Sequence, residues 1–198
     1  MCGIAGIVAY RESAPRVDRA ELLAVRESMA VRGPDGSGLW TSPDERTGLA
    51  HRRLAIIDPT EAASQPMANA DGRLHITFNG EIYNYRELRA GLVDRGRTFR
   101  TTSDTEVLLA LYAERGAAMV DALRGMYAFA IWDAAEGTLF LARDPFGIKP
   151  LYYADDGATL RFASQVKALL AGGALGREPD AAGHVGFFVL GSVPEPFT

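Results

Sequence analysis

Cysteine is nearly absent from this chain of 198 residues, since Cys2 is the only one. A single cysteine excludes an intramolecular disulfide and a cysteine-rich zinc site. It fits the reducing cytosol, where we expect the protein to reside. No run approaches the roughly 20 apolar residues of a membrane span, and the start MCGIAGIVAY lacks the basic segment of a signal peptide. No membrane association is therefore expected.

Blocks of like charge are missing as well. The formal net charge is −4, and charged residues make up 23% of the chain. The densest basic clusters, Arg52-Arg53 and residues 95–100, are too short to indicate a nucleic-acid surface. The three histidines are isolated from one another in sequence, so a metal site is not expected. Hydrophobic residues make up 47%, which is typical of a globular protein.

Apolar periodicity and turn residues predict a mixture of helices and strands, with hairpins in the second half. His75 is expected to face outward from its strand. The mixture does not alternate regularly, which favours an α+β fold with antiparallel sheets. Strands are predicted over residues 4–10, 49–57, 74–78, 98–102, 126–132, 138–142, 151–154 and 159–163, and helices over 18–30, 85–95, 105–115, 165–171 and 181–190.

The position of Cys2 makes its thiol a candidate nucleophile. Methionine before a small residue is normally trimmed, which would leave an α-amine on the same residue as the thiol. The usual pKa values of a thiol, about 8.5, and of an α-amine, about 7.7 to 8.0, are roughly matched. The amine, acting directly or through one water, can therefore serve as general base for its own side chain. A buried, inert cysteine is the alternative, but chain ends are seldom buried.

Seven motifs are distributed over the whole chain: MCGIAGIVAY, RGPDGSGLW, HRRLAIID, FNGEIYNYRELR, TSDTEV, LRGMYAFAIWD and RDPFGIKPLYY. Together they resemble the amino-terminal glutaminase domain of the asparagine synthetase family, which belongs to the class II, N-terminal-nucleophile amidotransferases. The resemblance implies a four-layer αββα sandwich, with two antiparallel sheets between helical layers.

Free glutamine is a zwitterion, so its pocket needs a cation, an anion and donors for the oxyanion formed at the amide carbon. The resemblance implies that Arg53 binds the carboxylate, and strand alternation places Arg52 on the opposite face. The wall beside Arg53 is expected from backbone and apolar groups of Leu54, Ala55, Ile56 and Ile57.

Asn79 and Gly80 follow the strand over 74–78, and the resemblance implies that they form the oxyanion hole. An ordinary Asn-Gly hairpin turn is the alternative, but a helix and not a strand is predicted after them. Glu81 and Asp104 are the candidates for the glutamine ammonium. Asp104 is the stronger of the two, and it is also expected to cap the helix over 105–115. The motif RDPFGIKPLYY is given no catalytic group.

Family members commonly carry histidine where Val31 stands and glutamate where Gln165 stands. They also continue into an ATP-dependent synthetase domain with a phosphate-binding loop, and no such loop occurs here. We therefore expect an amidotransferase domain over 1–175 and the start of a connection to a missing synthetase domain over 176–198. ATP and magnesium are expected only in that domain, and no cofactor is expected here. An apolar surface is predicted around Phe187, Phe188 and Phe197.

The resemblance favours aspartate as the acceptor of the ammonia, with other carboxylates, such as antibiotic, peptide or polysaccharide precursors, as the alternative. Whether the chain is a fragment or a free-standing subunit, and whether it forms a homodimer or needs a partner subunit, stays open. Two other interpretations are a catalytically silent regulatory domain and a Cys-His hydrolase that uses His51. The first predicts that catalytic groups are lost, and the second needs no free amino terminus.

Overall fold

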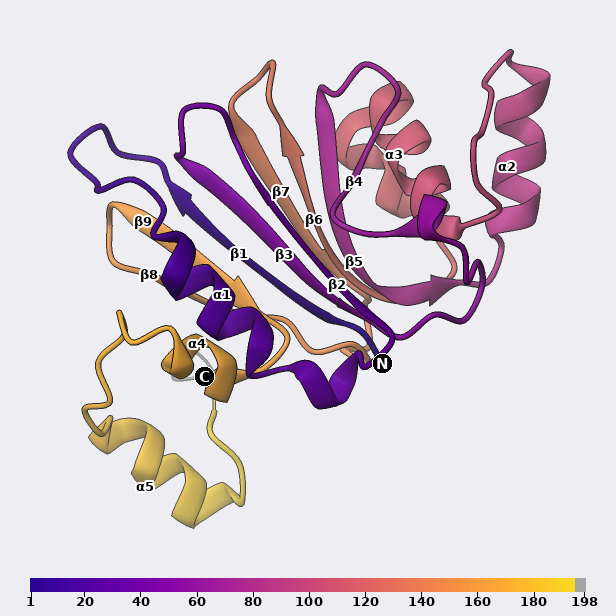
Figure 1. Cartoon of the computed structure of the whole chain (residues 1–198). Helices are drawn as coiled ribbons and strands as arrows, with labels where there is room; N and C mark the ends of the chain where they lie inside the picture. The colour runs from indigo at the N-terminus through magenta and orange to yellow at the C-terminus, as the bar shows by residue number, and fades with distance from the viewer. Residues whose placement is uncertain (195–198) are drawn as a thin grey trace.

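The computed structural model describes residues 1–194, and its strands form two sheets that face each other (Figure 1). All neighbouring strands within each sheet pair in antiparallel fashion. The first sheet has the order β2 (Gly36–Thr41), β3 (Thr47–Arg53), β1 (Gly3–Ala9), β9 (Thr159–Ala163), β8 (Tyr152–Asp155). The second has the order β4 (Met67–Ala68), β5 (Leu74–Ile82), β6 (Gly125–Asp133), β7 (Thr138–Arg143).

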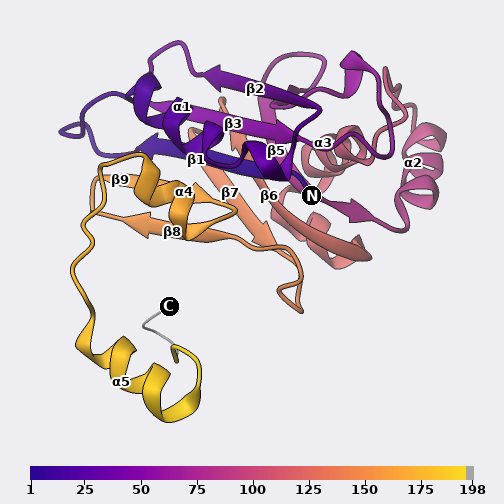
Figure 2. The same ribbon diagram turned by 60° about the horizontal axis from the view of Figure 1, so that its bottom comes forward.

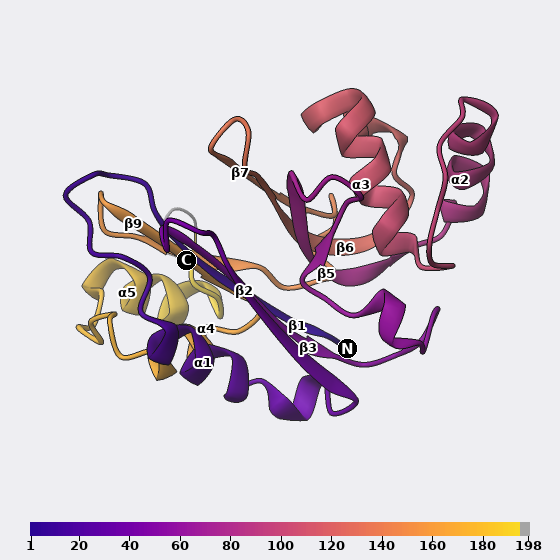
Figure 3. The same cartoon turned by 45° about the horizontal axis from the view of Figure 1, so that its top comes forward.

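Helices cover the outer face of each sheet, so the molecule has four layers (Figure 3). On the first sheet lie α1 (Arg19–Glu27) and α4 (Val166–Ala171), and on the second lie α2 (Tyr85–Asp94) and α3 (Asp104–Arg115). Short 3₁₀ helices span Ala30–Arg32, Glu61–Ala63 and Gly116–Ala122. The predicted α+β class and αββα sandwich are confirmed. Among the described residues, no helix has the length and apolarity needed to cross a membrane.

Strand β1 shows how the layers are built from the sequence. Its seven residues are all buried, and successive side chains point to opposite faces of the sheet. Ile4 belongs to the core between the sheets, together with Leu49, Ala128 and Phe162. Ala5 belongs to the core beneath α1, with Leu22. A strand that is apolar on both faces can only be central, so the residue before it, Cys2, is held at the end of the innermost layers.

The last helix, α5 (Ala181–Leu190), agrees with the prediction and lies apart from the sheets (Figure 2). Phe187 and Phe188 are 53% and 84% exposed, as expected of an apolar surface there. The predicted contribution of Phe197 lies outside the described residues. The domain boundary after residue 175 stays a prediction.

Two strand predictions were wrong at the site. The strand over 74–78 continues to Ile82, because residues 79–82 keep pairing with β6. The strand over 49–57 ends at Arg53, because its pairing with β1 ends at Arg52 and the Ala55 N–H then donates to the Asp35 carboxylate at 2.9 Å.

The predicted strand over 98–102 does not form. The carboxylate of Glu106, in the first turn of α3, accepts from the backbone N–H groups of Arg100 and Thr101 and from the Thr101 hydroxyl. These bonds take the place of a strand partner. The same local competition explains the helix cap, which is Ser103 and not Asp104: its hydroxyl accepts from the Thr105 N–H at 3.1 Å.

His75 does not face outward as predicted. It is 9% exposed and stacks on Trp40, with ring centroids 3.9 Å apart. The odd-numbered residues of β5 are polar, but the surface opposite them is the other sheet. Thr77 shows this too, because its hydroxyl donates to the Ala50 carbonyl of β3 at 3.0 Å. Alternating polarity therefore marked an inner face of the sandwich and not a solvated one.

Gly6 provides a test of the packing between neighbouring strands of the first sheet. A Cβ at this position would lie 2.4 Å from two ring atoms of Phe162, which is fully buried, and 2.9 Å from the Gly48 carbonyl oxygen. We expect Gly6→Ala to lower the free energy of unfolding by roughly 1 to 3 kcal/mol, because a packed core resists added volume. Urea denaturation measures the change. Gly176→Ala, where nothing lies within 4 Å, is the control and should change stability by less than about 0.5 kcal/mol. Equal effects at both positions would contradict this packing.

Candidate active site

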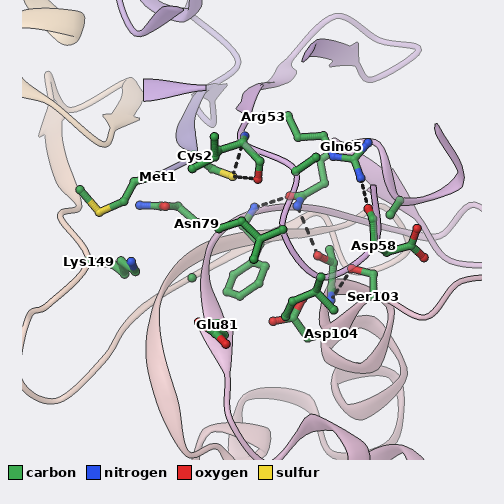
Figure 4. Close-up of a pocket in the computed structure, with 18 of the residues that line it drawn as sticks. Met1, Cys2, Arg53, Asp58, Gln65, Asn79, Glu81, Ser103, Asp104 and Lys149 are labelled. Carbon is green, nitrogen blue, oxygen red and sulfur yellow. Dashed lines mark hydrogen bonds between the residues drawn. The ribbon is translucent and has the colours of Figure 1, made fainter. Parts of the chain in front are cut away.

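One pocket opens where the start of β1, the end of β3, strand β5 and the start of α3 meet, and it encloses about 610 Å³ including its solvent-filled mouth (Figure 4). All ten residues predicted for the site line it: Cys2, Arg53, Leu54, Ala55, Ile56, Ile57, Asn79, Gly80, Glu81 and Asp104. They come from four stretches of chain that are far apart in sequence. Neither Val31, which is 96% exposed, nor Gln165 lines this pocket.

Cys2 sits where β1 begins, and its backbone is held in place. The Arg32 Nε donates to the Cys2 carbonyl at 3.0 Å, and Gly3 pairs with Arg52. The sulfur lies 3.4 Å from the Leu54 nitrogen and 3.6 Å from the Leu54 oxygen. Burial raises the pKa of the thiol, while the Leu54 N–H, the terminal ammonium and the cations Arg53 and Lys149 act in the opposite direction. The thiol is thus oriented and faces positive charge.

Arg53 points into the pocket from the last position of β3, whereas Arg52 reaches Glu27 on the outer helical layer. This is the alternation expected from the sequence. The guanidinium of Arg53 donates to the carbonyls of Thr60, at 2.9 Å, and of Asp58. Residues 54–57 form an irregular segment between Arg53 and Asp58. The cation is therefore fixed by the loop that follows it.

The open edge of β5 presents a row of backbone N–H groups to the pocket. Alternation along a strand directs the N–H groups of Phe78, Gly80 and Ile82 toward the same edge. The first donates to the Gln65 Oε1 at 2.6 Å, and the third to the Asp104 Oδ2 at 3.1 Å. In the part of the chain that the structure describes, no side chain accepts from the Gly80 N–H between them. A free donor therefore lies between two occupied ones.

Asn79 adds a second free donor. The residue is 1% exposed, and its Nδ2 has no hydrogen-bond partner among residues 1–194. An unpaired buried donor costs about 1 to 3 kcal/mol, so its presence in a pocket calls for an acceptor. A glycine is required at position 80 because a side chain there would collide with the neighbouring strand and with Phe78. A Cβ there would lie 2.4 Å from the Met126 carbonyl oxygen on β6 and 2.5 Å from the Phe78 ring.

The acidic side of the pocket is formed by Asp104, the first residue of α3, and Glu81. Asp104 is 4% exposed. Burial raises the pKa of its carboxyl to about 6, and the charge of Glu81 adds to the increase, against the N–H groups of Ile82 and Thr105. A buried carboxyl group close to the half-buried Glu81 favours a cationic ligand, because a positive charge would offset both the repulsion between the two groups and the desolvation of Asp104.

Lys149 was missed in the sequence, where its motif, RDPFGIKPLYY, was given no catalytic group. Its side chain lines the pocket and is 6% exposed. Its N–H donates to the Asp144 carboxylate at 3.0 Å, and its carbonyl accepts from the Arg143 Nε at 2.7 Å. Within the described range, its ammonium forms no ion pair. The sequence did contain an indication of its role, because Lys149 lies between Gly147 and Pro150. Such a rigid turn can hold a side chain in a fixed position.

The structure argues against a Cys-His pair built on His51. That residue is fully buried, its Nε2 lies 3.1 Å from the Phe78 carbonyl oxygen, and it does not line the pocket. Burial lowers the pKa of His51 to about 4, so it is neutral. Asp144, close to Lys149 in sequence, has a structural role. Its carboxylate accepts from the N–H groups of Tyr127, Phe146, Ile148 and Lys149.

Comparison with known proteins places this geometry among amidotransferases. The glutamine amidotransferase domain family matches residues 1–198. Asparagine synthetase [glutamine-hydrolyzing] 1 of Bacillus subtilis is 47% identical over 171 residues, which are 86% of this chain and 27% of that protein. Asparagine synthetase B [glutamine-hydrolyzing] of Escherichia coli is 42% identical over 171 residues, covering 86% of this chain and 30% of its own length.

The fold is similar to that of glutamine phosphoribosylpyrophosphate amidotransferase from B. subtilis, solved in complex with ADP and GMP. The TM-score is 0.70 at 24% identity, over 87% of this chain and 44% of that one. At this identity the likeness concerns the fold alone. The chain spans less than a third of the length of the two synthetases.

The cations around Cys2 can be tested through its reactivity, since it is the only cysteine. We expect Lys149→Met to shift the pH profile of iodoacetamide alkylation upward and to slow the reaction at pH 7.5, because one of the charges that lower the thiol pKa is removed. Lys149→Arg should retain the profile. The matched control is Lys167→Met, which removes the other, exposed lysine on α4. An unchanged profile in Lys149→Met would show that this ammonium does not act on the thiol.

Proposed function

Because this chain belongs to the glutamine amidotransferase domain family, we propose that its pocket binds free L-glutamine and hydrolyses the side-chain amide to glutamate and ammonia. The observation that carries the proposal is the unpartnered Nδ2 of Asn79, buried beside the Cys2 thiol. An amide-cleaving site must combine a nucleophile with donors for developing negative charge. The Gly80 N–H supplies a second donor.

The charged groups match the two ends of the zwitterion. Arg53 provides a planar donor fork for the α-carboxylate, and Asp104 with Glu81 provides the anionic side for the α-ammonium. Leu54, Ala55, Ile56 and Ile57 form the wall between them. Glutamine therefore enters with its charges fixed at one end and its amide directed toward Cys2.

The reaction follows from removal of Met1, which gives Cys2 the terminal α-amine. That amine, directly or through one water, takes the thiol proton as the sulfur attacks the amide carbon. The oxyanion accepts from the Asn79 Nδ2 and the Gly80 N–H. Breaking the C–N bond leaves a thioester, and the amine returns the proton to the nitrogen, which departs as ammonia. Water then cleaves the thioester, which releases glutamate and restores the thiol.

The use of the ammonia belongs to the same proposal. We propose that it amidates aspartate in an ATP- and magnesium-dependent step carried out by a synthetase domain or partner subunit outside this sequence. Glutamine hydrolysis itself then needs no cofactor in this chain. A free thiol nucleophile suits a reducing compartment, which supports the cytosol as its location.

The central test uses a chain whose amino terminus is blocked by a cleavable leader that ends directly before Cys2. We expect almost no glutamine hydrolysis before cleavage and full activity afterwards, because only cleavage creates the α-amine on Cys2. Release of glutamate and ammonia, without ATP, is measured on the same sample before and after, and mass spectrometry confirms the new terminus.

Cys2→Ala in the same format is the control and should stay inactive after cleavage. Full activity of the uncleaved chain would show that another group is the base. Hydrolysis by the cleaved Cys2→Ala variant would overturn the proposed nucleophile.

Binding of glutamine should depend on pH through Asp104. Its raised pKa means that the neutral acid persists up to about pH 6, so the carboxylate that attracts the ammonium is present above this pH and lost below it. We expect the affinity of the inactive Cys2→Ala variant to fall about tenfold per pH unit well below 6. Isothermal titration calorimetry measures it, and glutamine keeps both of its own charges in this range.

Asp104→Asn in the same background should bind glutamine weakly at pH 7.5, and its affinity should no longer depend on pH in this range. Asp121 is an exposed carboxylate beyond α3, so Asp121→Asn should leave both the affinity and its pH dependence unchanged. A flat profile in the parent would exclude Asp104 as the ammonium partner.

A further inference from the structure

The two charges proposed to hold glutamine belong to different layers of the fold. Arg53 ends β3 in the first sheet, whereas Asp104 begins α3 on the far side of the second sheet. Neither element alone fixes the distance between the guanidinium and the carboxylate. An α-amino acid carries its carboxylate and its ammonium on one carbon, so a pocket that selects it must fix this distance within a fraction of an ångström.

Asp58, which lies beside Arg53 in the pocket (Figure 4), also bonds to the segment before α3. Its backbone carbonyl accepts from the Arg53 guanidinium. Its Oδ2 accepts from the N–H of Thr102 at 2.9 Å and from the hydroxyl of the same residue at 3.0 Å. Thr102 lies two residues before Asp104, and Ser103 between them caps α3. Asp58 thus accepts hydrogen bonds both from Arg53 and from the segment that leads into Asp104. We call Arg53 and Asp104 together the clamp.

The other carboxylate oxygen of Asp58 fixes its own loop. Oδ1 accepts from the Thr60 N–H at 3.0 Å and from the Thr60 hydroxyl at 2.6 Å, and the Thr60 carbonyl is the second acceptor of the Arg53 guanidinium. The side chain is 7% exposed. Within residues 1–194 it forms no ion pair. Its charge is balanced by four amide and hydroxyl donors that belong to the two loops.

We propose that Asp58 is a positioning residue that sets the separation of Arg53 and Asp104 and so makes the pocket selective for an amide that carries both α-charges. This inference rests on the proposed function of the site. The Thr60 hydroxyl and the Thr102 N–H hold the pKa of Asp58 at about 2. The bridge therefore stays ionised throughout the range in which Asp104 titrates, and the two groups can be separated by pH.

Asp58→Asn keeps the shape of the side chain but places an NH₂ group against donors of either Thr60 or Thr102. A second connection between the same regions stays intact in this variant, because the Gln65 Nε2 donates to the Thr105 hydroxyl at 3.2 Å. We therefore expect the variant to fold, with a clamp whose two charges are no longer held at one separation.

The experiment compares L-glutamine with glutaramic acid, which has the carboxylate and the amide but lacks the ammonium. In Asp58→Asn we expect KM for glutamine to rise roughly 10- to 100-fold, the effect of losing a charged hydrogen bond, while kcat changes little. The preference for glutamine over glutaramic acid should narrow by a similar factor, since only glutamine uses both ends of the clamp. Thr102→Val, which removes the hydroxyl alone, should act in the same direction and be non-additive with Asp58→Asn.

Asp71→Asn is the matched control, because Asp71 likewise accepts from the backbone N–H two residues on, at Arg73, but lies in an exposed turn away from the pocket. The rate of Cys2 alkylation reports whether the catalytic end is intact. An unchanged preference in an active Asp58→Asn variant, or an equal loss on both substrates, would overturn the positioning role. A wild-type chain that does not hydrolyse glutamine at all would overturn the proposed function instead.

Discussion

Beyond Ile76, strand β5 has a neighbour on one side only, because β4 ends its pairing there while β6 continues to Ile82. Backbone N–H groups that lose water without gaining an acceptor are costly, so the open edge must be satisfied from elsewhere. The Gln65 amide oxygen serves Phe78 and the Asp104 carboxylate serves Ile82. The first acceptor comes from the loop that leads into β4 and the second from the start of α3, and these bonds hold both segments against the strand.

The pocket is a direct result of that arrangement. The Gly80 position lies between the two satisfied positions, and the side chain of Asn79 adds a donor from the inner face of the same strand. Neither donor can be met by the protein without filling the space in which a ligand binds. The buried Asp104 has the complementary need, since burial raises its pKa to about 6 and a cation would stabilise its charge. The pocket thus holds groups without protein partners, which a substrate with matching charge and acceptors would stabilise, a common cost of function.

Apolar periodicity predicted most of the helices and strands, because it reports burial regardless of which partner provides it, whereas the four layers followed from the family resemblance. The ten residues predicted for the site line one pocket. The errors arise where local bonds or a second sheet decide. His75 was predicted to be exposed because polarity alternates along β5, and no local pattern reveals that Trp40 lies opposite. The predicted strand over 98–102 is absent because its N–H groups bond to Glu106. The cap of α3 is Ser103 instead of Asp104. Both outcomes depend on hydrogen bonds between residues that are close in sequence. Lys149 and Asp58 were missed because their importance depends on which loops meet in space.

The bond from Arg32 to the Cys2 carbonyl separates the folding of this protein from the onset of its reactivity. A residue at the end of a chain is ordinarily poorly ordered and has no fixed position. Here the carbonyl of Cys2 is bound by a side chain 30 residues away, and Gly3 is already in the sheet. Loss of Met1 would therefore change the chemistry of the chain end without moving it. Under the mechanism proposed above, the fold can be complete while the thiol still lacks its base, and the protease that trims the start of the chain would then determine when the site becomes active.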